Sequence, residues 1–317
     1  MLFGLAKEQQ SVTNPSVPCR LTVVGDDCAV PRSQGKLVGR RGLAGTILSY
    51  KAAAAKAAQG KDIDAVQDVA EAVAGMCGTI GAGLDHCHIP GTAKGESFLD
   101  ETEVEIGMGI HNEAGIEKVK LASSKELIKR MLNFVIDTTD KERAFLPFKH
   151  DGKDEVVLMV NNLGGMSELE MSLISDDAVQ CLEGQGISVV RILCGSFITS
   201  LNLPGFSLTC LLLPRAGGKY SSSDILSLLD APASAPGWSS TTCVAPGKPK
   251  PATAPAPPQV RKSGGESVKP TDGKLMLSAL TSACEAAVKA EPEITRFDTI
   301  AGDGGEPSQW RLDSGVH

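Results

Sequence analysis

The stretch VVLMVNNLGGMSELEMSLISDDAVQCLEGQGISVVRIL, residues 156–193, decides the fold of this chain. Residues 156–160 form a continuous apolar run of the kind found in strands that are buried on both faces. A turn at 161–165 leads into a helix predicted over 167–183, and residues 187–193 form the next predicted strand. Strand, helix and strand at this spacing predict a right-handed βαβ unit, and therefore an α/β fold.

Further elements of the same kind are predicted on both sides of this unit. Residues 20–25 have the composition of a short strand, and residues 207–213 form another apolar strand. Helices are predicted over residues 43–58, which are rich in small side chains, and over residues 64–76. Together these elements predict an α/β fold in which mixed sheets carry helices on their faces.

The composition argues against several classes of protein. Of the 317 residues, 42% are hydrophobic and 22% are charged, which is typical of a soluble globular protein. A formal net charge of −7 argues against a broad basic surface, so no nucleic-acid partner is expected. The sequence has no run of about 20 apolar residues, so no membrane span is expected. The nine cysteines form no CxxC pair and are interpreted as reduced thiols of a cytoplasmic protein.

A change in composition divides the chain. Residues 237–272 are rich in Pro, Ala and Lys and contain few bulky apolar side chains, so they are predicted to form a disordered linker. Residues 1–236 before it form the predicted globular domain. Residues 273–317 begin with an amphipathic helix, predicted over 274–289, and are interpreted as the start of a second domain.

The most informative candidate for a functional site is the stretch ETEVEIGMGIHNEAG, residues 101–115. Apolar residues alternate here with polar residues and glycines, which predicts a strand with one functional face. That face carries a histidine, two glutamates and two glycines, namely His111, Glu103, Glu105, Gly107 and Gly109. The glycines leave room for a small substrate beside the imidazole, and a carboxylate can orient the ring. A structural or merely exposed histidine is the alternative.

A second candidate is a run of four residues that can each ligate a metal, Asp85, His86, Cys87 and His88. Consecutive residues on an extended chain point to alternate faces, whereas metal sites usually draw their ligands from spaced positions. We therefore expect no zinc site at this run, and we interpret it as a packed turn that leads to Pro90.

The third candidate is the stretch FDTIAGDGG, residues 297–305. Its carboxylates, Asp298 and Asp303, are hard oxygen ligands of the kind that Mg²⁺ prefers where it bridges to phosphates. An Asp-Gly pair is also a common turn signal, so the residues alone leave both interpretations open.

In this order, the segments resemble the ATP-dependent dihydroxyacetone kinase (glycerone kinase) family, in particular its fungal members. The matching stretches are VVGDDCAV, GRRGLAGTILSYKAAAAKA, GAGLDHCHIPG, EVEIGMGIHNEAG, VNNLGGMSELE and GSFITSLNLPGFSLTCLL. They are collinear and indicate that residues 1–236 correspond to the substrate domain of that family. Residues 291–305 resemble the opening of its second domain, which is all-helical and binds the nucleotide.

The resemblance implies a kinase that transfers a phosphoryl group from ATP to dihydroxyacetone or glyceraldehyde. In the family, a histidine of a GIH motif attacks the substrate ketone and forms a covalent hemiaminal, and His111 occupies that position. Three aspartates in the pattern D-x4-D-x-D hold ATP through Mg²⁺. Asp298 and Asp303 match the first two, whereas Gly305 stands at the third. A homodimer is implied for the intact protein.

The chain also departs from the family. After the histidine the family usually has Gly-Glu-Pro-Gly, where this chain has Asn112, Glu113, Ala114 and Gly115. The GGGSGH and GD-x-LNFG-like segments, which supply substrate contacts and acid/base chemistry, have no counterpart here, and neither has most of the nucleotide domain. We therefore expect domains truncated at both ends and a chain that is inactive alone. The alternative is a non-catalytic ketone-binding or regulatory module. A weaker one, lyase activity on FAD as in some animal relatives, would also need the nucleotide domain.

Overall fold

The computed structural model describes residues 18–34, 39–88, 99–215, 217–235, 237–238, 243–244 and 269–301. The chain divides into two compact units, Met1–Lys248 and Pro249–His317. In the described part of the second unit, a single helix, α7, runs over Pro270–Ala301. Most of the predicted linker, residues 237–272, lies outside the described residues, so the predicted domain boundaries stay predictions.

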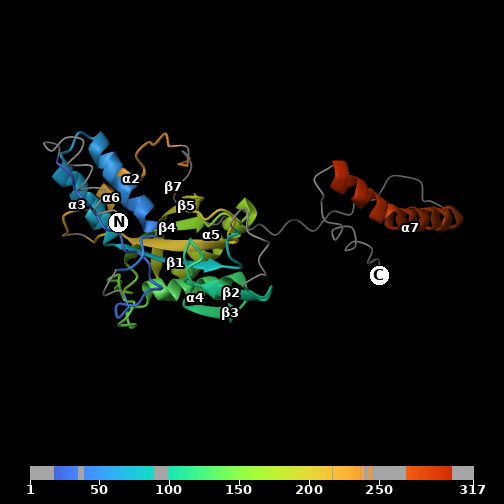
Figure 1. The fold of residues 1–317 in the computed structure, drawn as a ribbon, viewed down its shortest axis with the longest axis horizontal. Coiled ribbons are helices and arrows are strands. Elements are labelled where there is room, and N and C mark those ends of the chain that lie inside the picture. The colour runs from blue at the N-terminus through green and yellow to red at the C-terminus, as the bar shows by residue number, and fades with distance from the viewer. Residues whose placement is uncertain are drawn as a thin grey trace. The chain divides into compact units, whose positions relative to one another are not determined.

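A mixed sheet forms the centre of the first unit (Figure 1). Its described strands run in the order β3-β2-β1-β6-β4-β5-β7. Only β4 and β5 pair in parallel, and the other neighbours are antiparallel. Their bounds are Cys77–Gly83 for β1, Glu103–Ile106 for β2, Glu117–Lys120 for β3, Asp154–Asn162 for β4, Ile187–Gly195 for β5, Gly205–Leu212 for β6 and Cys243–Val244 for β7. The predicted fold class, α/β with a mixed sheet, is confirmed.

Most helices of the first unit begin where the local sequence supplies a capping side chain. Three of them start with a capping box, in which a serine and an acidic residue three positions later satisfy each other's backbone N–H groups. The serines are Ser123, Ser167 and Ser221. The helices of the first unit are α2 at Gly45–Ala58, α3 at Ile63–Ala74, α4 at Ser124–Ile136, α5 at Glu168–Gly184 and α6 at Ser222–Leu229. The three helices predicted in this region correspond to α2, α3 and α5, within two residues at each end.

Helices cover both faces of the sheet, which explains the apolar run in β4. Val156, Leu158 and Val160 lie in one core cluster with residues of α4 and α5. Val157 and Met159 point to the opposite face, where they pack with residues of α2, α3 and α6 (Figure 1). Because both faces of β4 are covered by helices, its side chains are apolar on both faces and do not alternate between apolar and polar. The sequence predicted such a strand.

Two strand predictions are wrong. Residues 20–25 form no strand: the segment is extended, and the sheet is reached only at Asp27, which makes an isolated bridge to Thr79. Val23 remains 70% exposed, so this apolar segment does not enter the core. The strand predicted to continue to His111 ends at Ile106, because Gly107 adopts a left-handed conformation with φ of +82° and turns the chain out of the sheet.

One buried carboxylate joins three elements of the first unit. Asp26 is fully buried and accepts hydrogen bonds from the backbone N–H groups of Leu43, at 2.6 Å, and Gly45, at 2.8 Å. It also accepts one from the hydroxyl of Thr79 on β1, at 2.5 Å, and Thr79 in turn contacts Thr209 on β6. Because Ala44 at the N-cap position of α2 has no capping side chain, Asp26 serves as the cap from a distant part of the chain.

Replacing this carboxylate should be costly. In an Asp26→Ala variant three buried donors lose their acceptor, and each buried unsatisfied donor costs about 1–3 kcal/mol. We expect the free energy of unfolding, measured by urea titration with circular dichroism, to fall by at least about 3 kcal/mol. The matched control is Asp62→Ala, which removes the exposed N-cap of α3 and should cost about 1 kcal/mol. Equal losses in the two variants would contradict the proposed role of Asp26.

Candidate active site

The candidate nucleophile lies in the turn that joins β2 to β3. The side chain of His111 is 78% exposed. Its ring atom Nδ1 lies 2.9 Å from Oε1 of Glu113, and its backbone N–H donates to Oε2 of the same carboxylate, also at 2.9 Å. One glutamate two residues further along therefore holds both the backbone and the ring of the histidine.

This contact determines which ring nitrogen can react. Burial opposes ionisation of Glu113, but the hydrogen bonds from His111 outweigh it and lower the pKa of the carboxyl below its usual value. An ionised carboxylate only accepts hydrogen bonds, so Nδ1 must carry the proton. The lone pair of a neutral ring is then on Nε2, which has no hydrogen-bond partner among the described residues.

Arg41 connects the turn to the buried residue Asp27. Arg41 donates from Nη2 to the carbonyl oxygen of Gly107, at 2.7 Å, and from Nε to the buried carboxylate of Asp27, at 2.5 Å. Burial raises the pKa of Asp27, and the Arg41 guanidinium acts against that rise. Gly109 leaves the space that this arrangement needs, because a Cβ there would lie 2.1 Å from Oε2 of Glu113 and 2.7 Å from Nη1 of Arg41.

The loop after β1 lies against the same turn. The side-chain amide of Asn112 makes two hydrogen bonds to the backbone of Cys87. On the other side of the loop, Oδ1 of Asn202 accepts from the backbone N–H of His88, at 2.9 Å. Burial works against ionisation of the Cys87 thiol, but hydrogen bonds from Ser200 and the 201–202 backbone lower its pKa below the usual value.

The predicted functional face is not formed. Glu105 turns into the protein, where it accepts from the backbone N–H of Gly115 at 2.6 Å and lies 3.7 Å from Nε2 of His86. Glu103 lies at the start of β2 and contacts the backbone of Asp100 instead of the histidine. Because Gly107 turns the chain out of the sheet, the alternation of the strand no longer applies at Gly109 and His111. The carboxylate that orients the ring is Glu113, which the sequence pattern did not single out.

The four potential metal ligands do not face a common point. Asp85 accepts from the backbone N–H of His86, His86 faces Glu105, and Cys87 is held by Ser200. Over the residues that the structure describes, no group of three His, Cys, Asp or Glu side chains is arranged to hold a metal ion. Of the residues assigned to Mg²⁺, Asp298 falls within α7, while Asp303 and Gly305 lie outside the described residues.

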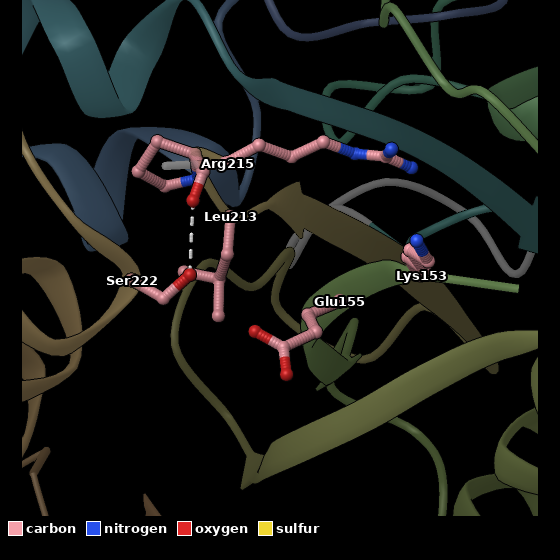
Figure 2. A pocket seen from close by; sticks show the side chains of 6 residues that line it. Lys153, Glu155, Leu213, Arg215 and Ser222 are labelled. Atoms are coloured by element: carbon pink, nitrogen blue, oxygen red, sulfur yellow. Dashed lines mark hydrogen bonds between the residues drawn. The ribbon is translucent and has the colours of Figure 1, made fainter. Parts of the chain in front are cut away.

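The surface hollows lie elsewhere. Figure 2 shows one of about 270 Å³, between the ends of β4 and β6 and the start of α6. Lys153, Glu155 and Arg215 line it, and the hydroxyl of Ser222 donates to the carbonyl oxygen of Pro214 at its edge. Arg215 is already paired with Asp151 and Asp154. Neither this hollow nor a second one near α2 and α3 includes His111, whose side chain is exposed among the residues that the structure describes.

The fold and the turn define a class of protein, an α/β domain with an exposed histidine whose ring is oriented by a carboxylate. Residues 1–237 match the Dak1 domain, and the chain belongs to the dihydroxyacetone kinase family.

The relatives and solved structures agree with that family. The chain is 40% identical over 319 residues to the dihydroxyacetone kinase of Pichia angusta, covering 95% of this chain and 51% of the relative. It is 41% identical over 312 residues to dihydroxyacetone kinase 2 of Saccharomyces cerevisiae, covering 95% and 50%. The crystal structure of the native dihydroxyacetone kinase of C. freundii superposes with a TM-score of 0.65 at 25% identity, covering 97% of this chain and 51% of that one. The chain thus spans about half the length of the curated relatives it matches.

The described part of the chain contains no helix with both the length and the apolar character needed to cross a lipid bilayer.

The surroundings of Cys87 lead us to predict that its thiol is more reactive than that of an ordinary cysteine. Because its pKa is lowered, Cys87 should carry more thiolate at pH 7 than an ordinary cysteine and react faster with iodoacetamide. Cys28 and Cys210 should stay unlabelled in the folded protein, since burial raises the pKa of each to about 12. In a Ser200→Ala variant the pH dependence of Cys87 alkylation should move to higher pH, as measured by mass spectrometry of peptides. An unchanged pH profile would rule out the Ser200 hydrogen bond.

Proposed function

We propose that this chain is the substrate-holding part of an ATP-dependent dihydroxyacetone kinase, which transfers a phosphoryl group to dihydroxyacetone or glyceraldehyde. The observation that carries the proposal is the geometry of His111. Its Nδ1 is bound to an ionised carboxylate, and its Nε2 faces solvent with a lone pair available. A ring held this way is a nucleophile suited to a carbonyl carbon.

Capture of the ketone is a reversible addition. The lone pair on Nε2 attacks the carbonyl carbon, a C–N bond forms, and the π electrons of C=O move to the oxygen, which takes up one proton from water and leaves hydroxide in the solvent. The ring becomes an imidazolium, and its Nδ1–H lies 2.9 Å from the Glu113 carboxylate. That carboxylate stabilises the positive charge as it develops, so it favours the adduct over the free ring.

This chemistry also selects the substrate. Dihydroxyacetone and glyceraldehyde each have a carbonyl carbon that can accept the nitrogen, whereas glycerol has none. Covalent attachment fixes a small flexible triose in one orientation, which places its hydroxyl for phosphoryl transfer. The site therefore favours short ketones and aldehydes over polyols of the same size.

ATP and Mg²⁺ are proposed for the whole protein. One related structure is titled as the C. freundii enzyme in complex with AMP-PNP and Mg²⁺. In this chain Asp298 and Asp303 are the proposed Mg²⁺ ligands, and Gly305 supplies no carboxylate at the third position. No described group of side chains forms a site for the metal, so no step of the mechanism is assigned to it here. A homodimer and a location in the cytoplasm are likewise proposals for the whole protein.

A non-catalytic ketone-binding or regulatory module is not favoured, because the most similar curated relatives are named as kinases. The kinase proposal is tested with the whole protein, Mg-ATP and dihydroxyacetone, by following the phosphate ester with ³¹P NMR, and this chain alone is expected to form none. Glycerol serves as the substrate that should not react. Transfer to glycerol at the same rate would exclude a mechanism that depends on carbonyl capture.

Capture itself can be measured without ATP. With dihydroxyacetone labelled with ¹³C at the carbonyl, the protein should convert part of the ketone resonance into that of a tetrahedral carbon. His111→Ala and His111→Asn should abolish the new resonance. The control is His88→Ala, whose ring is also exposed but in a different loop, and it should leave the resonance intact. Persistence of the tetrahedral carbon in both His111 variants would refute the proposed nucleophile.

The role of Glu113 has its own test. Glu113→Gln retains the shape of the side chain but cannot neutralise the imidazolium, so the equilibrium constant for capture should fall about ten-fold. Glu101→Gln, a change of an exposed glutamate just before β2, is the matched control and should have no effect. Titration of the ¹³C signal with ketone gives both constants. A Glu113→Gln variant that captures as well as the wild type would show that the carboxylate is not needed.

A further inference from the structure

The residue after the nucleophile has an unusual backbone. Asn112 has φ of +65°, and only one other described residue besides glycines, His150, has a positive φ. Most side chains avoid this left-handed region, which asparagine tolerates better than others. The turn therefore has a conformation that glycine adopts easily, at a residue that also carries a polar side chain.

That side chain is engaged by a single partner. Oδ1 of Asn112 accepts from the backbone N–H of Cys87 at 2.8 Å, and Nδ2 donates to the carbonyl oxygen of Cys87 at 3.0 Å. Both polar atoms of the amide are thus satisfied by the backbone of one residue, in the way that two strands pair. We define these two bonds as the Asn112 clamp.

The clamp is attached to a fixed part of the protein. The segment that carries Cys87 follows β1, and the backbone N–H of Leu84 donates to the carbonyl oxygen of Pro204 at 2.8 Å. Asn202 accepts from the backbone N–H of His88, so the loop is also held on its other side. Because β1 pairs with β6 over seven residue pairs, the clamp connects the turn to the centre of the sheet.

The ring of His111 has little other support. With 78% of its side chain exposed, it is held only by Glu113 among the described residues. Glu113 is 44% exposed and lies in the same turn. The position of the pair relative to the rest of the protein therefore depends on the backbone of the turn, and Asn112 lies between the two residues.

We propose that Asn112 is a positioning residue for the nucleophile: its clamp on Cys87 fixes the turn so that His111 and Glu113 hold the geometry needed for carbonyl capture. This inference rests on the proposed function. Asn112 has two roles in this proposal, and they can be tested separately. One is to tolerate a positive φ, which glycine does as well, and the other is to bind Cys87, which glycine cannot do.

Three substitutions at this position test the proposal. Asn112→Gly keeps the backbone conformation and removes the clamp, while Asn112→Ala removes the clamp and disfavours the conformation. Asn112→Asp keeps the acceptor for the Cys87 N–H but places an oxygen against its carbonyl. Each variant is assayed for capture of ¹³C-labelled dihydroxyacetone, for thermal stability, and for the line width of the His111 ring signals.

If the clamp positions the nucleophile, the equilibrium constant for capture falls about ten-fold in Asn112→Gly, because the turn loses the two hydrogen bonds that hold it in place. The His111 ring signals broaden in that variant, and Asn112→Ala and Asn112→Asp are impaired at least as much. If Asn112 only serves the backbone, Asn112→Gly captures like the wild type and Asn112→Ala alone is impaired, which overturns the proposal.

Two further outcomes are distinguishable. If the wild type itself forms no tetrahedral adduct, the proposed function fails before the role of Asn112 is tested by capture. The ring signals still decide that role, because unchanged line widths in Asn112→Gly would show that the clamp does not order the turn. If Asn112→Gly does not fold, the proposal is tested with Asn112→Asp. An Asn112→Asp variant that captures the ketone as well as the wild type would overturn the proposal.

Discussion

The buried carboxylate of Asp26 is the interaction on which the first unit depends. It accepts hydrogen bonds from the start of α2 and from Thr79 on β1, and through Thr79 it reaches β6. A carboxyl group without solvent contact is stable only when its polar atoms are hydrogen-bonded, so these elements must assemble together. Gly45 is part of the same constraint, because a Cβ there would lie 2.8 Å from the carboxylate.

The next residue extends this constraint to the candidate site. Asp27 is also buried, and it holds Arg41, whose guanidinium reaches the carbonyl oxygen of Gly107 at the base of the His111 turn. Two consecutive aspartates therefore serve two different purposes. One joins the helix to the sheet, and the other connects that junction to the turn. The turn is thus tied to the core by Arg41 on one side and by Asn112 on the other.

The sequence allowed the central unit to be predicted, because a strand covered by helices on both faces leaves a continuous apolar run that is hard to mistake. His111 was singled out from its motif, and its role as the nucleophile stays a prediction. Its partner was missed because the period of two was extended past Ile106, and no period reveals that Gly107 turns left-handed. The contact of Arg41 with Gly107 joins residues 66 positions apart, and such tertiary pairing leaves no local signal.

The exposure of His111 also bears on the proposed covalent capture. A triose has so few atoms that noncovalent contacts on an open turn can supply only a fraction of the binding seen in enclosed pockets. A reversible C–N bond supplies affinity and orientation together, but only if the ring is already in place when the ketone arrives. Packing cannot fix the orientation of the His111 ring, because its side chain is 78% exposed. Hydrogen bonds within the turn, and between the turn and the rest of the first unit, must therefore fix it. On this reasoning Glu113, Arg41 and Asn112 are the described residues that order the proposed nucleophile.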